Sequence, residues 1–174
     1  VLNPLWAVQD YLNIPEHFND FLAIRISVAS ISLFILVFRK QLKMGNEFLV
    51  FIPVLGIALQ NAYMYSVMDV VSVQKHTLAY IALFIGVGML VIWKAYYSVI
   101  LVSLTLIANI IFFLMFSPLT RGEILANGGL LVLTVALFMK ILIQTRYSLI
   151  RNVLIARFEL EASNKQLDLQ KEEI

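Results

Sequence analysis

Few side chains in this sequence could do chemistry, and most of those stand inside strongly apolar segments. Gln60 and Asn61 lie just beyond the middle of one apolar segment, and Asn109 lies at a similar depth two segments later. A polar group in lipid is costly unless it is paired, so each of these residues is a candidate for binding. A few polar groups among apolar walls suit a small, largely hydrophobic ligand. The predicted ligand-binding residues are Arg25, Gln60, Asn61, Tyr65, Asn109 and Phe113.

The amides also have a simpler interpretation, as hydrogen-bonding contacts between helices. Such contacts contribute about 0.6 kcal/mol each in a membrane, and they need no ligand. Taken singly, Gln60, Asn61 and Asn109 fit this structural role; taken as a set at one depth, they fit a pocket. Arg25 stands one turn inside the outer end of its segment, near Asp20 in the sequence. The sequence leaves both interpretations open.

Other kinds of chemistry find little support. The chain has no cysteine, which excludes disulfides and thiolate metal sites, and no Ser-His-Asp arrangement, carboxylate pair or metal motif is visible. His17 and His76 are expected in outer loops, where histidines are usually solvated. Lys140 stands four residues before Gln144, so its ammonium can reach the membrane surface; no acidic residue at mid-membrane offers a counter-ion for a retinal Schiff base. We therefore expect no catalytic residue, no metal and no cofactor.

The composition indicates the elements that must position these residues. Hydrophobic residues make up 61% of the chain and charged residues 14%, against about 45–50% and about 25% in soluble domains. The predicted fold is an all-α, polytopic membrane bundle. Residues 1–14 are too short to span a bilayer, which needs about 20 residues, and are interpreted as the end of a truncated first span. The five complete spans are predicted at residues 21–38, 48–68, 77–93, 96–116 and 128–144.

The basic residues of the loops predict the orientation of this six-span bundle. Lys75 and Arg121 lie on one side, and a larger set lies on the other: Arg39, Lys40, Lys43, Lys94, Arg146 and Arg151. Short loops rich in Lys and Arg are retained in the cytoplasm. The C-terminus is therefore expected in the cytoplasm. A net charge of +2 is too small to suggest nucleic acid as a partner.

The last span is expected to continue as one helix into water, because no glycine or proline follows Gly129. Its soluble part carries an apolar residue every seventh position, at Val153, Leu160, Leu167 and Ile174. With these at the d positions of a heptad, Asn164 falls at a, where a buried Asn favours a parallel two-stranded coil. We therefore predict a homodimer through residues 149–174, a sensor bundle in residues 1–148, and an output domain beyond Ile174. The alternative is a solvated helix that pairs with nothing.

Several stretches together resemble a known family. These are LAIRISVASISLFILVFRKQL (22–42), FIPVLGIAL (51–59), the tight WKAYY turn (93–97) and a last span that runs into a coil. Over about residues 4–150 the chain resembles the six-span sensor domain of CqsS-type quorum-sensing histidine kinases. Related sensor domains occur on some bacterial class III cyclases. The resemblance implies a protein of the bacterial inner membrane. Such a protein would act as a dimer, bind a long-chain ketone within the membrane bundle and control a histidine kinase or a nucleotide cyclase.

Two other classes of function compete with a membrane-embedded sensor of a small hydrophobic ligand or of the lipid state. A small transporter or channel subunit would need charged residues along its pathway, and almost none stand at depth in this sequence. A purely structural protein would use its helices only to dimerise. The sequence names neither the ligand nor the output enzyme.

Overall fold

The structure is a computed structural model that describes residues 3–172. These residues form helices joined by short loops, with no β-strand among them, which confirms the predicted all-α class. The long helices are α2 (Phe18–Phe38), α3 (Asn46–Val67), α4 (Val70–Leu90), α5 (Ala95–Phe116) and α7 (Leu130–Glu172). The short elements are η1 (Asn3–Trp6), α1 (Ala7–Asn13), η2 (Pro15–His17), α6 (Arg121–Ile124) and the π-helical turn η3 (Leu125–Gly129).

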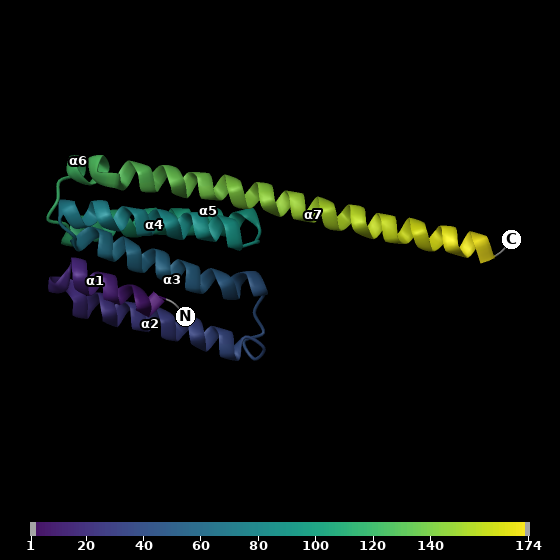
Figure 1. Cartoon of the computed structure of the whole chain (residues 1–174), viewed down its shortest axis with the longest axis horizontal. Coiled ribbons are helices and arrows are strands. Elements are labelled where there is room, and N and C mark those ends of the chain that lie inside the picture. Colours follow the sequence, from purple (N-terminus) through teal and green to yellow (C-terminus); the bar gives the residue numbers. More distant parts are fainter. Residues whose placement is uncertain (1–2, 173–174) are drawn as a thin grey trace.

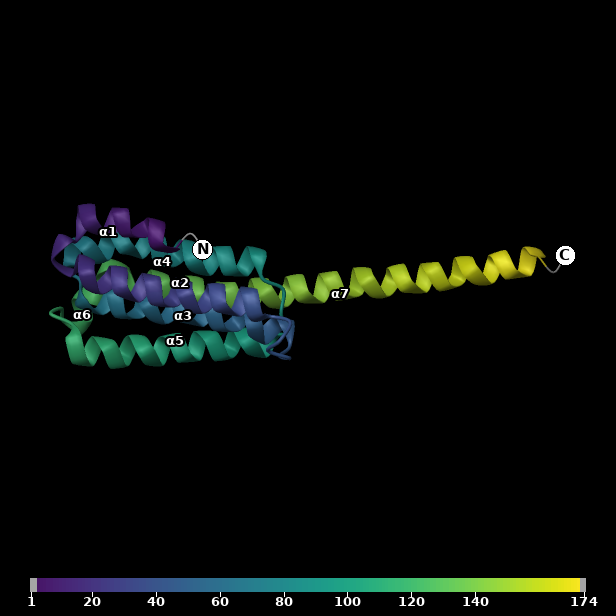
Figure 2. The ribbon, with the colours of Figure 1, turned by 90° about the horizontal axis from the view of Figure 1, so that it is seen from below.

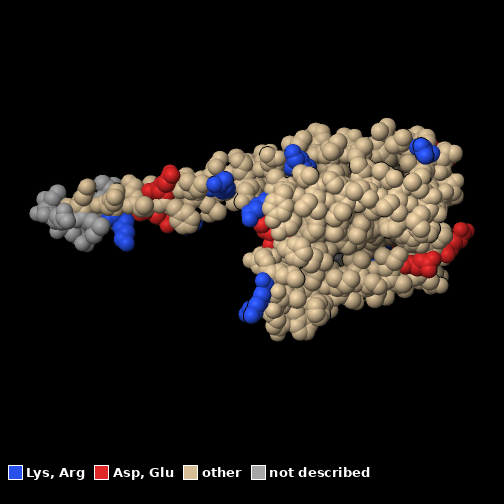
Figure 3. Space-filling model, turned by 180° about the vertical axis from the view of Figure 1, so that it is seen from behind, with Lys and Arg blue, Asp and Glu red and all other residues tan. Residues whose placement is uncertain are grey.

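Five of the helices are long and apolar enough to cross a membrane. Apolar side chains cover most of the outward surface of the bundle, and the charged side chains visible in Figure 3 lie toward its ends and on the projecting helix. Backbone polar groups in lipid must be satisfied within the segment, and long apolar helices meet that demand. The sixth, truncated span remains a prediction, because residues 3–13 form only η1 and α1.

The bundle pairs α3 with α5 and α4 with α7, while α2 lies against α3 and carries α1 on its surface. We call the end from which α7 projects the exit end, and the opposite end the far end (Figures 1 and 2). The buried core runs between the two ends and includes the aromatic rings of Phe21, Phe51, Tyr65, Tyr80, Phe84 and Trp93. At the exit end, Trp93 donates a hydrogen bond of 2.8 Å to the Ser98 hydroxyl. This bond ties the short α4–α5 connection to the first turn of α5.

Helix α4 begins earlier than the sequence predicted. Its N-cap is Asp69, whose carboxylate accepts a hydrogen bond of 2.9 Å from the backbone N–H of Ser72. This hydrogen bonding lowers the pKa of the Asp69 carboxyl below its usual value. The first turns of α4 are polar, and for that reason hydropathy assigned them to a loop. The prediction that His76 is a solvated loop residue was therefore wrong: His76 lies on α4 and is only 7% exposed.

The chain enters α7 through a tight reversal. Thr120 and Glu123 form a capping box at the start of α6, and η3 follows with Gly128 at φ +132°. This left-handed backbone favours glycine. A Cβ at position 128 would also lie 2.3 Å from Thr77 Oγ1. Glycine therefore lets the first turn of α7 lie directly against α4.

Helix α7 is the longest element and leaves the bundle without a break. It has 43 residues, which at about 1.5 Å per residue gives a rod of about 65 Å. Every residue from Arg151 to Gln166 is exposed in the single chain, including Val153, Leu160 and Asn164. Leu167 is described by its backbone alone, and Ile174 lies outside the described residues. The coiled coil thus remains a prediction, while the continuous helix that it requires is present.

Candidate functional site

The six predicted binding residues lie in two separate places. Arg25, Gln60 and Asn61 belong to a hydrogen-bonded network at the far end, around a polar cavity of about 600 Å³. Tyr65, Asn109 and Phe113 line a second, mainly apolar space of about 200 Å³, which we call the slot. A matching depth in the membrane therefore did not mean a shared site, because depth leaves open which side of a helix a residue faces.

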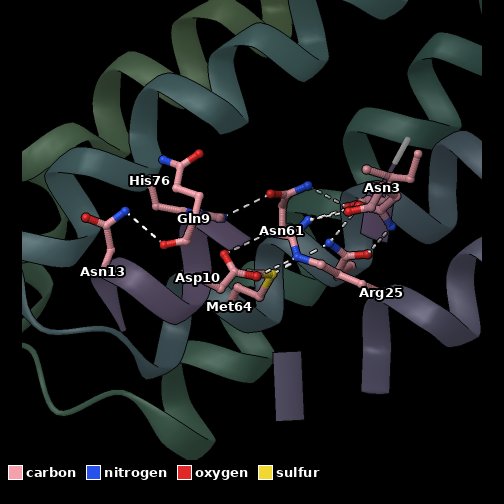
Figure 4. A network of polar contacts seen from close by, with 10 residues as sticks. Asn3, Gln9, Asp10, Asn13, Arg25, Asn61, Met64 and His76 are labelled. Carbon is pink, nitrogen blue, oxygen red and sulfur yellow. Dashed lines mark hydrogen bonds and ion pairs between the residues drawn. The ribbon is translucent and has the colours of Figure 1, made fainter. Parts of the chain in front are cut away.

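The polar cavity is built around an ion pair between α1 and α2. Arg25 donates from Nε and Nη2 to the two carboxylate oxygens of Asp10, at 2.6 and 3.0 Å. Both residues are buried, with 5% and 4% of their surfaces exposed. A third bond, of 2.9 Å, runs from Arg25 Nη1 to the side-chain oxygen of Asn3 (Figure 4). Such a two-pronged pair fixes both orientation and distance, so it holds α1 on α2.

Further hydrogen bonds connect this pair through Asn3 to α3, and a separate contact joins α3 to α4. Asn3 donates a bond of 2.7 Å to the side-chain oxygen of Gln60. Asn61 uses its nitrogen on the backbone oxygen of Ile57, at 2.8 Å, and its oxygen lies 3.0 Å from His76 Nε2. In the view of Figure 4, Asn61 lies between His76 and Asn3. Because these side chains bond mainly to one another, the network fits the simpler interpretation of the amides as hydrogen-bonding contacts between helices.

Asn3, Asp10 and His76 are network members that the sequence prediction missed. Asp10 was visible as a lone acid in a short apolar segment, and Arg25 as a lone base in the next. The usable signal was this pair of opposite charges in two apolar segments, since each is costly there without the other. The prediction instead placed Arg25 near Asp20, which is closer in sequence.

The slot lies between α4, α5 and the first turns of α7. Its walls are apolar and come from all three helices: Tyr80, Phe84, Ile110, Phe113, Val132, Leu133 and Ala136. Asn109 donates 2.9 Å to the Tyr80 hydroxyl and 2.8 Å to the backbone oxygen of Thr105. The Asn109 side-chain oxygen receives no hydrogen bond from the described residues. Three helices thus enclose a narrow space with one amide oxygen free to accept.

The hydroxyl of Thr105 is the most informative group in the slot. Thr105 is 4% exposed, and among the described residues its Oγ1 is the buried side-chain atom without a hydrogen-bond partner. Thr77 and Thr134, by contrast, each donate 2.8 Å to the backbone oxygen four residues earlier. An unpaired buried hydroxyl costs about 1–3 kcal/mol. The structure therefore carries an unmet hydrogen bond on a residue that lines the slot.

No family model, curated protein or solved structure matches this chain. Among the described residues, no group of three or more His, Cys, Asp or Glu could hold a metal ion.

Helix α4 connects the two spaces. Ala79, Ala82 and Leu83 line the polar cavity, whereas Tyr80 and Phe84 line the slot. Only the slot is also lined by α7, the helix that leaves the bundle. An occupant of the slot would therefore touch the projecting helix directly, and a change in the polar cavity would reach α7 through α4.

Proposed function

We propose that this chain is the membrane-embedded input domain of a signal-transduction receptor. A small, mainly apolar ligand binds in the slot, and α7 transmits the resulting change away from the membrane. The observation that carries this proposal is the unpartnered, buried hydroxyl of Thr105, a residue that lines a slot whose wall includes the start of α7. A site of that kind binds a ligand and contacts the helix that leaves the bundle.

The slot indicates the class of ligand. Its volume of about 200 Å³ is below the roughly 300–1,000 Å³ of pockets for drug-sized molecules, so it suits a slender occupant such as a single alkyl chain. Thr105 can donate to an oxygen of that occupant, and the Asn109 oxygen can accept from a hydroxyl. An alkyl chain with one hydroxyl group satisfies both requirements, and one with a carbonyl group satisfies the first. The family resemblance, with its long-chain ketone, agrees with this class.

Transmission requires two packings of the bundle with different affinity for the ligand. The packing of α5 against α7 can differ between the two states, because an occupant of the slot lies between these two helices. We further propose that two copies pair through the heptads of α7, with the exit end in the cytoplasm of a bacterium. The resemblance favours a histidine kinase as the output enzyme, with a nucleotide cyclase as the alternative.

A transporter or channel is less well supported. Among the described residues, Asp10 and Arg25 are the buried side chains that carry a formal charge, and they bond to each other. A conduction pathway would use charged or polar groups that are free to meet a solute. The pair instead closes the network that holds α1 on the bundle.

The proposal is tested by photolabelling the purified chain in nanodiscs with a fatty alcohol that carries a diazirine on its alkyl chain. We expect label on slot residues of α5 and α7, and several-fold less label there in Ala136→Phe, which fills the slot. Ile107→Phe adds a ring to a lipid-facing position of α5 that is 52% exposed and serves as the matched control. Equal labelling of both variants would show that the slot is not a binding site.

A further inference from the structure

Two contacts at the far end hold α7 on α4. The Gln74 side chain donates 2.7 Å to the side-chain oxygen of Asn127, just before α7. Next to it, Gly128 packs so closely on Thr77 that a Cβ would overlap the threonine hydroxyl. Thr77 in turn lies 3.1 Å from the hydroxyl of Tyr65, a slot residue. The start of α7 is therefore seated on α4 beside the slot.

A second pair of contacts holds the same two helices together at the exit end. Gly88 of α4 lies so close to α7 that an added Cβ would be 2.9 Å from Leu142 Cδ2 and 3.4 Å from Met139 Cγ. One turn further along α7, Arg146 donates from Nη1 to the backbone oxygen of Gly88 at 3.1 Å and also to that of Met89. These contacts join two helices at the point where α7 leaves the bundle.

The chemistry of the Arg146 contact follows from the end of α4. The last carbonyl groups of a helix have no partner within the helix, and they form the negative end of its dipole. Helix α4 ends at Leu90, and the cap N–H of Val91 satisfies Val87 only. The guanidinium of Arg146 supplies both the positive charge and the donor for the next two carbonyls.

We infer that Arg146 is a positioning residue that fixes α7 in register on α4, so that the two helices move as one unit. A slide of α7 by one residue is about 1.5 Å, and it would carry the guanidinium away from its carbonyls and Asn127 away from Gln74. Sliding is therefore opposed at both ends. Given the proposed function, the signal leaves the bundle as a tilt or rotation of the α4–α7 pair against α3 and α5, and not as a piston motion of α7.

The register can be measured by double electron–electron resonance on the purified chain in nanodiscs, without any ligand. The chain has no cysteine, so two introduced cysteines are the only sites for spin labels. The exit-end pair is Leu90→Cys with Leu149→Cys, at positions 82% and 59% exposed. The far-end pair is Leu78→Cys with Leu131→Cys, at positions 70% and 52% exposed. The far-end pair reports whether the bundle remains folded.

Arg146→Ala and Arg146→Gln should broaden the exit-end distance distribution, or shift it by about 1.5 Å for each residue of slip, and leave the far-end distribution unchanged. Arg146→Lys keeps a charged donor and should restore most of the wild-type distribution. Such a recovery would show that the charged hydrogen bond, and not the volume of the side chain, fixes the register. Arg151→Ala, at an exposed position further along α7, is the matched control and should match the wild type.

The inference is overturned if Arg146→Gln and Arg151→Ala both give the wild-type distribution. If Arg146→Ala broadens both label pairs, that variant has lost its fold, and the Gln and Lys variants decide the question. Because no ligand is present, the result stands apart from the photolabelling test. Failure of labelling at the slot would refute the proposed function and leave the register of α7 as measured.

Discussion

Replacing Thr105 with valine tests the central observation of the slot, because it removes the unpartnered hydroxyl and keeps a branched side chain. In most buried positions, loss of a hydroxyl costs a hydrogen bond. Here there is no bond to lose, and the desolvated hydroxyl itself costs about 1–3 kcal/mol. Because hydrogen bonds in membranes average only about 0.6 kcal/mol, we expect Thr105→Val to raise the free energy of unfolding by an amount near the lower bound of this range, about 1 kcal/mol. For a chain of this size that corresponds to a rise in Tm of about 2–4 °C.

The assay is thermal unfolding in detergent, followed by the fluorescence of Trp6 and Trp93, at one scan rate for all variants because unfolding can be irreversible. Thr105→Ser keeps the hydroxyl and loses a buried methyl group, so it should lower Tm. Thr105→Val should also reduce photolabelling by the fatty alcohol, so that stability and binding change in opposite directions. A Thr105→Val chain that is less stable than the wild type would refute the reasoning, since the hydroxyl would then have a partner in the folded protein.

Three further predictions concern the network, the orientation and the coil. Asp10→Leu should destabilise the chain by about 3–5 kcal/mol, because it leaves the buried Arg25 unpaired. The double variant Asp10→Leu/Arg25→Met should recover most of that loss. A wild-type Tm for Asp10→Leu alone would show that the ion pair does not stabilise the fold. A cysteine at Lys40 should be protected from a membrane-impermeant maleimide in intact cells, and labelling from outside would reverse the orientation. Leu160→Cys should form a disulfide between two chains faster than Gln166→Cys, and equal rates would mean a solvated helix without a seam.

The sequence was sufficient to predict most of the helices, because lipid permits few alternatives to a long apolar helix. It also predicted the unbroken course of α7, since neither glycine nor proline occurs within it. It failed at the start of α4, where the polar residues between Asp69 and Thr77 lower the local hydropathy although they are helical. The Asp69 cap was the signal for that start, as Asp is a preferred N-cap residue.

The candidate site was harder to predict, because hydropathy gives the depth of a residue but not the direction that it faces. Asn61 and Asn109 stand at similar depth, yet Asn61 meets His76 and Asn109 meets Tyr80 on another side of α4. The role of Thr105 could not be predicted at all. A threonine in a membrane helix usually bonds to its own backbone, and only the three-dimensional arrangement reveals that this one does not.

Movement of α7 by an occupant of the slot can be tested without knowing the natural ligand. In the Thr105→Cys chain, octyl methanethiosulfonate attaches an alkyl chain inside the slot. Spin labels linked through oxime chemistry to p-acetylphenylalanine at Val99 of α5 and Leu149 of α7 then report the distance between the two helices. Ile107→Cys places the same alkyl chain on the lipid-facing side of α5 and is the control.

We predict that octyl modification of Thr105→Cys shifts the Val99–Leu149 distance distribution, and that modification of Ile107→Cys leaves it unchanged. Mass spectrometry gives the modified fraction of each chain. An unchanged distribution with Thr105→Cys fully modified would contradict the claim. So would a Thr105→Cys chain that resists modification while Ile107→Cys reacts, because the slot would then be closed to ligands from the membrane.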